Sequence, residues 1–246
     1  MSGHSKWSTI KRKKGAIDAR KSKIFSRLSK EITVAAREGG VDAETNPRLR
    51  LAINNAKGVN MPKENISRAI SKAERDDSIL QEVTYEGYLP NGIAVFIECL
   101  TDNINRTVGN IRAIFNKRSG SLGTNGSLSF IFDRKGVFNV PKEGLDPDEF
   151  QLEIIDAGVE DFQIEDDVFV ITSPVEAFGN VQKKLEEMGI QPEVAELQRI
   201  PNDAKELSVE DSLRILKIID EFEDDDDVQY VFHNLAITDE VMNELG

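Results

Sequence analysis

Hydrophobic residues in the first part of the chain recur at the three- and four-residue spacing of amphipathic helices. A first helix is expected from about Ala16, and Gly39-Gly40 is typical of its end. Asn46-Pro47 predicts a second helix, because a capping residue is followed by proline in the first turn. Pro62 opens a third in the same way. We expect a small helical bundle whose inner positions are Ile24, Phe25, Leu28, Ile32, Ala35, Ala36, Leu49, Ala52, Ile53, Ala56, Ile66, Ala69, Ile70 and Ala73.

After the polar segment Asp76-Asp77-Ser78 the apolar positions change to the pattern of strands. Residues 82–87 and 93–100 predict a hairpin, because a turn rich in proline, asparagine and glycine separates them. Residues 103–117 predict a helix, and residues 127–132 alternate like a further strand. This segment therefore predicts a β-β-α-β unit.

A second α+β unit is expected from about Arg134 onward. Its apolar pattern gives the order β-α-β-β-α-β, which is that of a ferredoxin-like domain with two helices on one face of an antiparallel sheet. The expected elements are strand 136–140, helix 146–157, strand 162–165, strand 168–172, helix 174–188 and strand 190–197.

The last part of the chain predicts one helix, 208–222, and one strand, 228–234. Neither could bury its apolar face alone, so we expect both to return to the β-β-α-β unit and complete it. The fold class is thus α+β with three domains: a basic three-helix bundle at 1–78, a discontinuous central α/β sandwich at 79–133 and 205–246, and an inserted ferredoxin-like domain at 134–204.

Charge is distributed very unevenly along the chain. Residues 1–78 contain 18 Lys and Arg against 9 Asp and Glu, while the remainder contains 13 against 35, so the net charge of −13 conceals a basic N-terminal part. Basic residues bind polyanions by releasing the counterions condensed on phosphate backbones. A nucleic acid is therefore the expected partner.

Among the first thirty residues the only acidic one is Asp18. A solvated helix face usually explains a run of charges, but such faces mix both signs, and this one does not. Trp7 could pack on the domain or stack on a base. The expected nucleic-acid-binding residues are Lys6, Trp7, Lys11, Arg12, Lys13, Lys14, Arg20, Lys21, Lys23, Arg27 and Lys30.

Candidates for catalysis or metal binding are weak. The two histidines and one cysteine fit no zinc spacing, and Cys99 lies in an apolar run that predicts a buried thiol. Asp224 to Asp227 are expected to form a solvated turn rather than a cation site. Thr101-Asp102-Asn103 is interpreted as a helix cap. We therefore expect no enzyme activity, no cofactor, no metal and no small-molecule substrate.

Several motifs resemble those of the YebC/PmpR family. They include SGHSKW, AAREGG, the segment N-x-x-L-R-x-A-I-x-x-A-K and N-M-P-K-x-N-I-x-R-A-I, and they continue at Tyr85-Glu86-Gly87-Tyr88 and at Leu100-Thr101-Asp102-Asn103. This resemblance covers most of the chain. It implies a cytoplasmic DNA-binding transcriptional regulator, with relatives that act in translation, including a mitochondrial translational activator of cytochrome c oxidase.

Two functions remain open. In the first, the basic bundle binds duplex DNA, with Lys and Arg on phosphates and modest sequence specificity. In the second, the same residues bind ribosomal RNA or tRNA, and the ribosome is a further expected partner. No apolar run approaches the roughly 20 residues that span a bilayer, so no membrane partner is expected. The basic N-terminus also lacks the apolar stretch of a secretion signal, and we expect a cytoplasmic protein.

Overall fold

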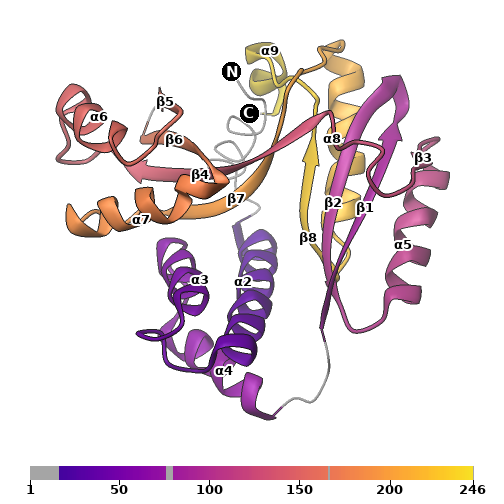
Figure 1. Cartoon of the computed structure of the whole chain (residues 1–246). Helices are drawn as coiled ribbons and strands as arrows, with labels where there is room; N and C mark the ends of the chain where they lie inside the picture. Colours follow the sequence, from indigo (N-terminus) through magenta and orange to yellow (C-terminus); the bar gives the residue numbers. More distant parts are fainter. Residues whose placement is uncertain (1–16, 76–79, 166, 246) are drawn as a thin grey trace. The chain divides into compact units, whose positions relative to one another are not determined.

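The fold is α+β, as expected, with helices and two antiparallel sheets (Figure 1). The computed structural model describes residues 17–75, 80–165 and 167–245. The chain divides into two compact units, and each is described by itself below. Unit 1 contains residues 78–133 and 199–246, and unit 2 contains residues 19–77 and 134–198.

The helical part of unit 2 has the three helices that the apolar spacing predicts. They are α2 (Ile17–Gly39), α3 (Pro47–Gly58) and α4 (Lys63–Arg75). The expected inner positions form one core, and Leu28, Ile32, Leu49 and Ala69 are among its buried members. The hydroxyl of Thr33 on α2 lies 3.0 Å from the carbonyl oxygen of Ala69 on α4.

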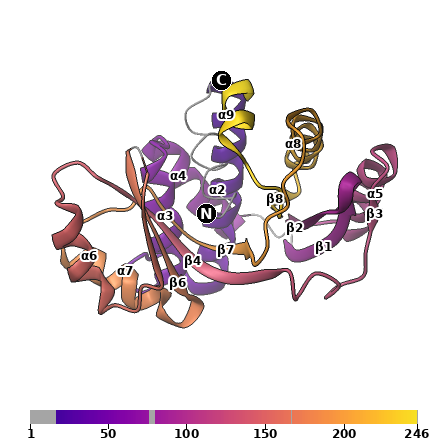
Figure 2. The same ribbon diagram turned by 90° about the horizontal axis from the view of Figure 1, so that it is seen from above.

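The second part of unit 2 has the predicted β-α-β-β-α-β order. The elements are β4 (Phe132–Pro141), α6 (Pro147–Ile155), β5 (Asp161–Ile164), β6 (Val168–Pro174), a 3-10 turn η2 (Val175–Ala177), α7 (Phe178–Glu187) and β7 (Val194–Pro201). The strands are arranged β5-β6-β4-β7, the order of a ferredoxin-like sheet. One core joins α6 and α7 to the sheet, because Phe150, Ile154, Val181 and Leu185 pack together with Phe169 and its neighbours. Figure 2 shows both helices beside the strands β4 and β6.

Unit 1 is a four-stranded sheet with the order β3-β1-β2-β8. The strands are β1 (Gln81–Leu89), β2 (Ile93–Thr101), β3 (Ser121–Leu122) and β8 (Val228–His233), and the helices are α5 (Ile104–Lys117), α8 (Val209–Glu223) and α9 (Asp239–Leu245). β1 and β2 form the predicted hairpin through a single 3-10 turn, η1 (Pro90–Gly92), in which Asn91 has a φ of 61°. β8 pairs antiparallel with β2, which confirms that the end of the chain returns to this sheet.

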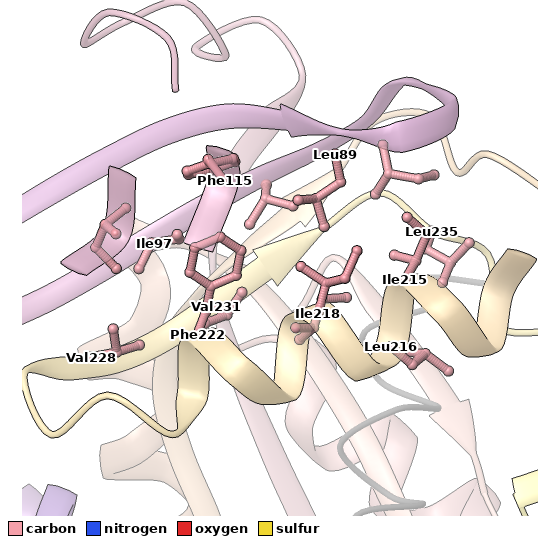
Figure 3. Packing of buried hydrophobic residues seen from close by; sticks show 14 of the residues in the cluster. Leu89, Ile97, Phe115, Ile215, Leu216, Ile218, Phe222, Val228, Val231 and Leu235 are labelled. Atoms are coloured by element: carbon pink, nitrogen blue, oxygen red, sulfur yellow. The ribbon is translucent and has the colours of Figure 1, made fainter. Parts of the chain in front are cut away.

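Helices α5 and α8 cover one face of this sheet, and apolar side chains from all of these elements interdigitate (Figure 3). The rings of Phe115 on α5 and Phe222 on α8 lie 4.9 Å apart, and both residues are completely buried. Cys99 is buried in the same core, as its apolar surroundings in the sequence predict.

The strand expected at residues 127–132 is wrong. Residues 125–131 form turns, and β4 begins only at Phe132. The reason is the buried carboxylate of Glu86, which accepts hydrogen bonds from the backbone N–H groups of Gly126 (2.7 Å) and Leu128 (2.6 Å). These N–H groups are thus satisfied by a side chain rather than by a neighbouring strand. Leu128 is buried with Phe96 and Phe132 in a core on the second face of the sheet.

The acidic turn after α8 also differs from the expectation of a solvated segment, because Asp227 is buried. Its carboxylate accepts hydrogen bonds from the Arg106 guanidinium (2.8 Å) and the Thr107 hydroxyl (2.8 Å). Burial raises the pKa of the Asp227 carboxyl, but the hydrogen bonds from Arg106, Thr107 and Thr101 outweigh burial and hold this pKa below its ordinary value. The predicted helix cap is confirmed, since Asn103 Oδ1 accepts from the backbone N–H of Arg106 at 3.0 Å.

Removing one donor from Asp227 should destabilise the protein in a pH-dependent way. We expect Thr107→Val to lower the free energy of unfolding at pH 7 by about 1–3 kcal/mol, because a buried carboxylate loses a hydrogen bond while side-chain volume is conserved. The pKa of Asp227 is depressed in the folded state, so its contribution is complete above the unfolded pKa and is lost as pH falls through the folded value. The difference between wild type and variant should therefore shrink below about pH 4.

Urea unfolding followed by circular dichroism at several pH values measures this difference. Thr107→Ser is the matched control, because it keeps the hydroxyl and should retain most of the stability at pH 7. A loss in Thr107→Val that is the same at every pH would contradict the role assigned to the hydrogen bond.

Candidate nucleic-acid interface

The helical bundle of unit 2 carries the part of the predicted site that the structure describes. Lys6, Trp7, Lys11, Arg12, Lys13 and Lys14 lie outside the described residues. Arg20 and Lys21 belong to the first turns of α2. Lys23 is exposed, and Lys30 is partly exposed on the same helix.

Arg27 differs from a fully solvated basic residue. Its side chain is 29% exposed, and its guanidinium lies 3.9 Å from the carboxylate of Glu196 on β7, within the same unit. Part of its charge is therefore compensated by an acidic neighbour. This contact was not expected, because residues so far apart in the chain give no sign of their proximity in the apolar pattern.

Further basic residues of α3 and α4 lie outside the set that the charge run of the first thirty residues indicates. Lys57, Lys63, Arg68 and Arg75 are exposed, and within the described part of the chain none of them forms an ion pair. The only signal for them in the sequence was the basic balance of residues 1–78 as a whole. By contrast, Arg48 is paired with Glu38 on the neighbouring helix.

Asn46 holds α2 and α3 together beneath this surface. Its Oδ1 accepts a hydrogen bond from the Leu49 N–H (3.0 Å), which is the predicted N-cap, and its Nδ2 donates to the carbonyls of Ala35 (2.7 Å) and Gly40 (2.8 Å). The fit is close, because a Cβ on Gly39 would lie 2.6 Å from the Asn46 amide nitrogen. One buried side chain therefore satisfies the end of one helix and the start of the next.

Asn55 of α3 makes a comparable connection to the sheet of the same unit. Its amide donates to the Ala195 carbonyl (2.9 Å), and its Oδ1 accepts from the Ala195 N–H (3.0 Å). A cleft of about 180 Å³ lies nearby, lined by Leu51, Asn54, Gln182, Glu186 and Gln191 among others. Because its lining contains no Lys or Arg, this cleft is not suited to binding a phosphate backbone.

The described residues show no group of three or more histidine, cysteine, aspartate and glutamate side chains able to hold a metal ion. A search of the same residues for a helix with the length and apolar content to cross a bilayer finds none. The side chains that could carry chemistry near Thr101 instead form structural hydrogen bonds around Asp227.

Comparison with known proteins gives consistent matches over nearly the whole chain. Residues 5–76 match the family model described as the TACO1/YebC protein N-terminal domain, and residues 80–235 match the one for the TACO1/YebC second and third domain. A relative from Amoebophilus asiaticus is 50% identical over 240 residues, which cover 96% of this chain and 98% of the relative. One from Rubrobacter xylanophilus is 47% identical over 249 residues, which cover 100% of both chains. Each is named a probable transcriptional regulatory protein.

A solved structure shows the same fold. The crystal structure of a conserved hypothetical protein from Aquifex aeolicus matches with a TM-score of 0.80 and 40% sequence identity, over 92% of this chain and 94% of that chain.

The bundle should depend on Asn46. We expect Asn46→Ala to destabilise it by about 1–3 kcal/mol, because the cap of α3 is removed and two carbonyls lose their amide donor. Hydrogen exchange of the α2 and α3 amides measures this effect directly. Thr45→Ala is the matched control, since the Thr45 hydroxyl makes one exposed hydrogen bond to the Asp42 carbonyl and should matter little. Equal protection in the two variants would contradict the role given to Asn46.

Proposed function

Since the chain belongs to the TACO1/YebC family, we propose that it is a non-enzymatic, nucleic-acid-binding regulator of gene expression, acting as a DNA-binding transcriptional regulator. Its relatives' names support a regulatory role. We choose a nucleic acid as the partner because basic residues are concentrated at one end of the chain. Residues 1–78 contain 18 of the 31 Lys and Arg.

The basic residues of the N-terminal segment and of the bundle bind phosphates in this proposal. Lys and Arg that contact phosphates fix the position of a protein on a duplex but carry no sequence information. We therefore expect modest sequence specificity. Lys63 and Arg68 on α4 are also exposed, and the proposal includes them among the phosphate-binding residues.

We propose that function is divided among three domains. The domain at 1–78 binds the nucleic acid, while the acidic domains at 79–133 with 205–246 and at 134–204 contact protein or remain in solvent. A cytoplasmic location is part of this proposal. The absence of catalysis is supported by the use of Thr101, Asn103, Thr107 and Asp227 in hydrogen bonds that hold the fold.

A second candidate is a ribosome-associated translation factor that binds ribosomal RNA or tRNA. The observation in its favour is Trp7, a single tryptophan within a strongly basic segment. Aromatic side chains stack on unpaired bases, which folded RNA offers and duplex DNA does not.

Charge reversal on the N-terminal segment should weaken binding without unfolding the bundle. We expect Lys13→Glu with Lys23→Glu to raise the Kd for duplex DNA. The slope of log K against log salt should also become less steep, by about 0.9 for each phosphate that is no longer neutralised. Fluorescence anisotropy across a salt series measures both quantities. Lys183→Glu with Lys184→Glu is the matched control, because it removes the same charge from α7 and should leave binding unchanged.

The pair Lys63→Glu and Arg68→Glu tests whether α4 belongs to the interface. If α4 belongs to the interface, the slope of log K against log salt becomes less steep in this variant than in the wild type, while circular dichroism shows intact helices. Equally weakened binding in the α7 control would mean that overall charge, and not this surface, determines affinity, and the proposal would fail.

Competition distinguishes the two candidate functions. A complex with promoter DNA is challenged with tRNA or ribosomal RNA at matched phosphate concentration and near-physiological salt. For a transcriptional regulator we expect one promoter fragment to be retained against both RNA and random DNA. Preferential binding of RNA together with co-sedimentation with ribosomes would instead select the translation factor.

A further inference from the structure

Helix α6 and strand β5 expose three large aliphatic side chains. Leu152 and Ile155 of α6 are 72% and 52% exposed, and Ile164 of β5 is 58% exposed. Single exposed apolar residues are ordinary on protein surfaces, but these three belong to two elements that pack against each other. The contact between the elements is an aromatic pair, Phe150 and Phe162, whose ring centroids lie 5.8 Å apart.

The helical geometry places Leu152 and Ile155 on the outer face of α6. Phe150 and Ile154 face the core, and a residue two positions after Phe150 points roughly the opposite way at 100° per residue. Leu152 and Ile155 are three positions apart, so they are neighbours on this outer face.

Ile164 lies on the side of the sheet that carries α6. Phe162 packs into the core of that side, with its ring 5.1 Å from that of Phe169. Side chains two positions apart in a strand share a face, so Ile164 is on the same side at the end of β5. We call the outer face of α6 together with this end of β5 the α6–β5 surface, and Leu152, Ile155 and Ile164 are its exposed aliphatic residues. Figure 1 shows where α6 and β5 lie.

β5 is also an edge strand. Among the described strands it pairs only with β6, with Asp161 opposite Thr172 and Ile164 opposite Phe169. Its other edge has backbone groups that can accept a further strand.

The electrostatic surroundings of this surface are strongly negative. Residues 143–167 contain eleven Asp and Glu and no Lys, Arg or His. From outside this segment, Lys135 pairs with Glu160 at 2.6 Å, and Lys142 donates to the Glu165 carbonyl at 3.0 Å. Most of the acidic charge remains, and the carboxylates of Asp148, Glu149, Glu153 and Asp156 lie on the exposed side of α6 or at its end.

We propose that the α6–β5 surface binds a Lys- and Arg-rich protein segment that also carries apolar side chains. The apolar side chains cover Leu152, Ile155 and Ile164, and the basic groups pair with the surrounding carboxylates. A second copy that docked through this same surface would place like charges against each other, and both nucleic acid and anionic lipid are repelled. Binding at this surface is independent of the function assigned to the basic bundle.

The test uses the full-length protein and two fluorescent synthetic peptides of equal charge. One peptide contains Lys, Arg and Leu, and the other has Ser in place of every Leu. We expect the Leu peptide to bind more tightly at near-physiological salt, where charge attraction alone is screened. We expect Leu152→Ser with Ile155→Ser to weaken its binding about tenfold or more, as is usual when apolar anchors are removed from an interface.

Phe130→Ser is the matched control, because Phe130 is also 72% exposed but lies in unit 1, and it should leave peptide affinity unchanged. Glu149→Lys with Glu153→Lys is a second variant that keeps the aliphatic residues and should also weaken binding. Circular dichroism verifies folding. Equal binding of the two peptides, or unchanged binding by the Leu152→Ser, Ile155→Ser variant, would overturn the proposal.

Two other occupants are separated by the same assay. Lys11→Glu with Arg12→Glu should not change peptide affinity, and an increase would show that the chain's own basic segment holds this surface. Sedimentation of the free protein tests for a second copy. We expect the Leu152→Ser, Ile155→Ser variant to have the same oligomeric state as the wild type. Either contrary result would replace the proposed partner.

Discussion

The pairing of β2 with β8 is the constraint on which unit 1 depends. Val95 pairs with His233 and Ile97 with Val231, so the sheet is complete only when the chain has returned after the whole inserted segment. β2 has apolar side chains on both faces, since Ile93 and Ile97 belong to one core and Ala94 and Phe96 to another. Bringing residues so distant in the chain together costs loop-closure entropy, and burial on both faces of β2 offsets this cost.

Two buried carboxylates stabilise the loops around this sheet. Asp227 connects the start of β8 to the start of α5 through Arg106 and Thr107. Glu86 holds the loop at residues 126–128 through backbone N–H groups. Each carboxylate has protein donors in place of the water molecules that it loses on burial, as buried polar groups require.

These carboxylates also explain which parts of the fold the sequence could not predict. The apolar spacing and the helix-capping residues predicted most of the helices and strands in their correct order, and Asn46-Pro47 identified the cap of α3. The short strand β3 was not predicted. The pattern at residues 127–132 alternates like a strand, but its N–H groups bind Glu86, and this partner lies forty residues away in the chain. α9 was missed because seven residues offer too little periodicity.

The candidate site was less predictable than the fold, for a related reason. Counting charges locates the basic part of the chain, but it does not tell which Lys and Arg side chains are available to bind a phosphate. Arg27 was selected with its neighbours on α2, yet it contacts Glu196, whereas Arg68 was not selected and is exposed without an ion pair among the described residues. Whether a basic side chain is available depends on acidic side chains from distant segments that can pair with it, as Glu196 does with Arg27.

The distribution of charge also determines how the two kinds of surface can be used together. At physiological ionic strength the Debye length is about 8 Å, so charges on one surface act mainly on what touches that surface. The basic bundle can therefore attract a polyanion although the whole chain has a net charge of −13. A nucleic acid bound as proposed would be repelled by the acidic segment at residues 143–167 wherever the two came close, and it would leave the carboxylates of that segment available to cationic groups. A chain that carries both signs in separate segments is suited to contact two partners of opposite charge at once.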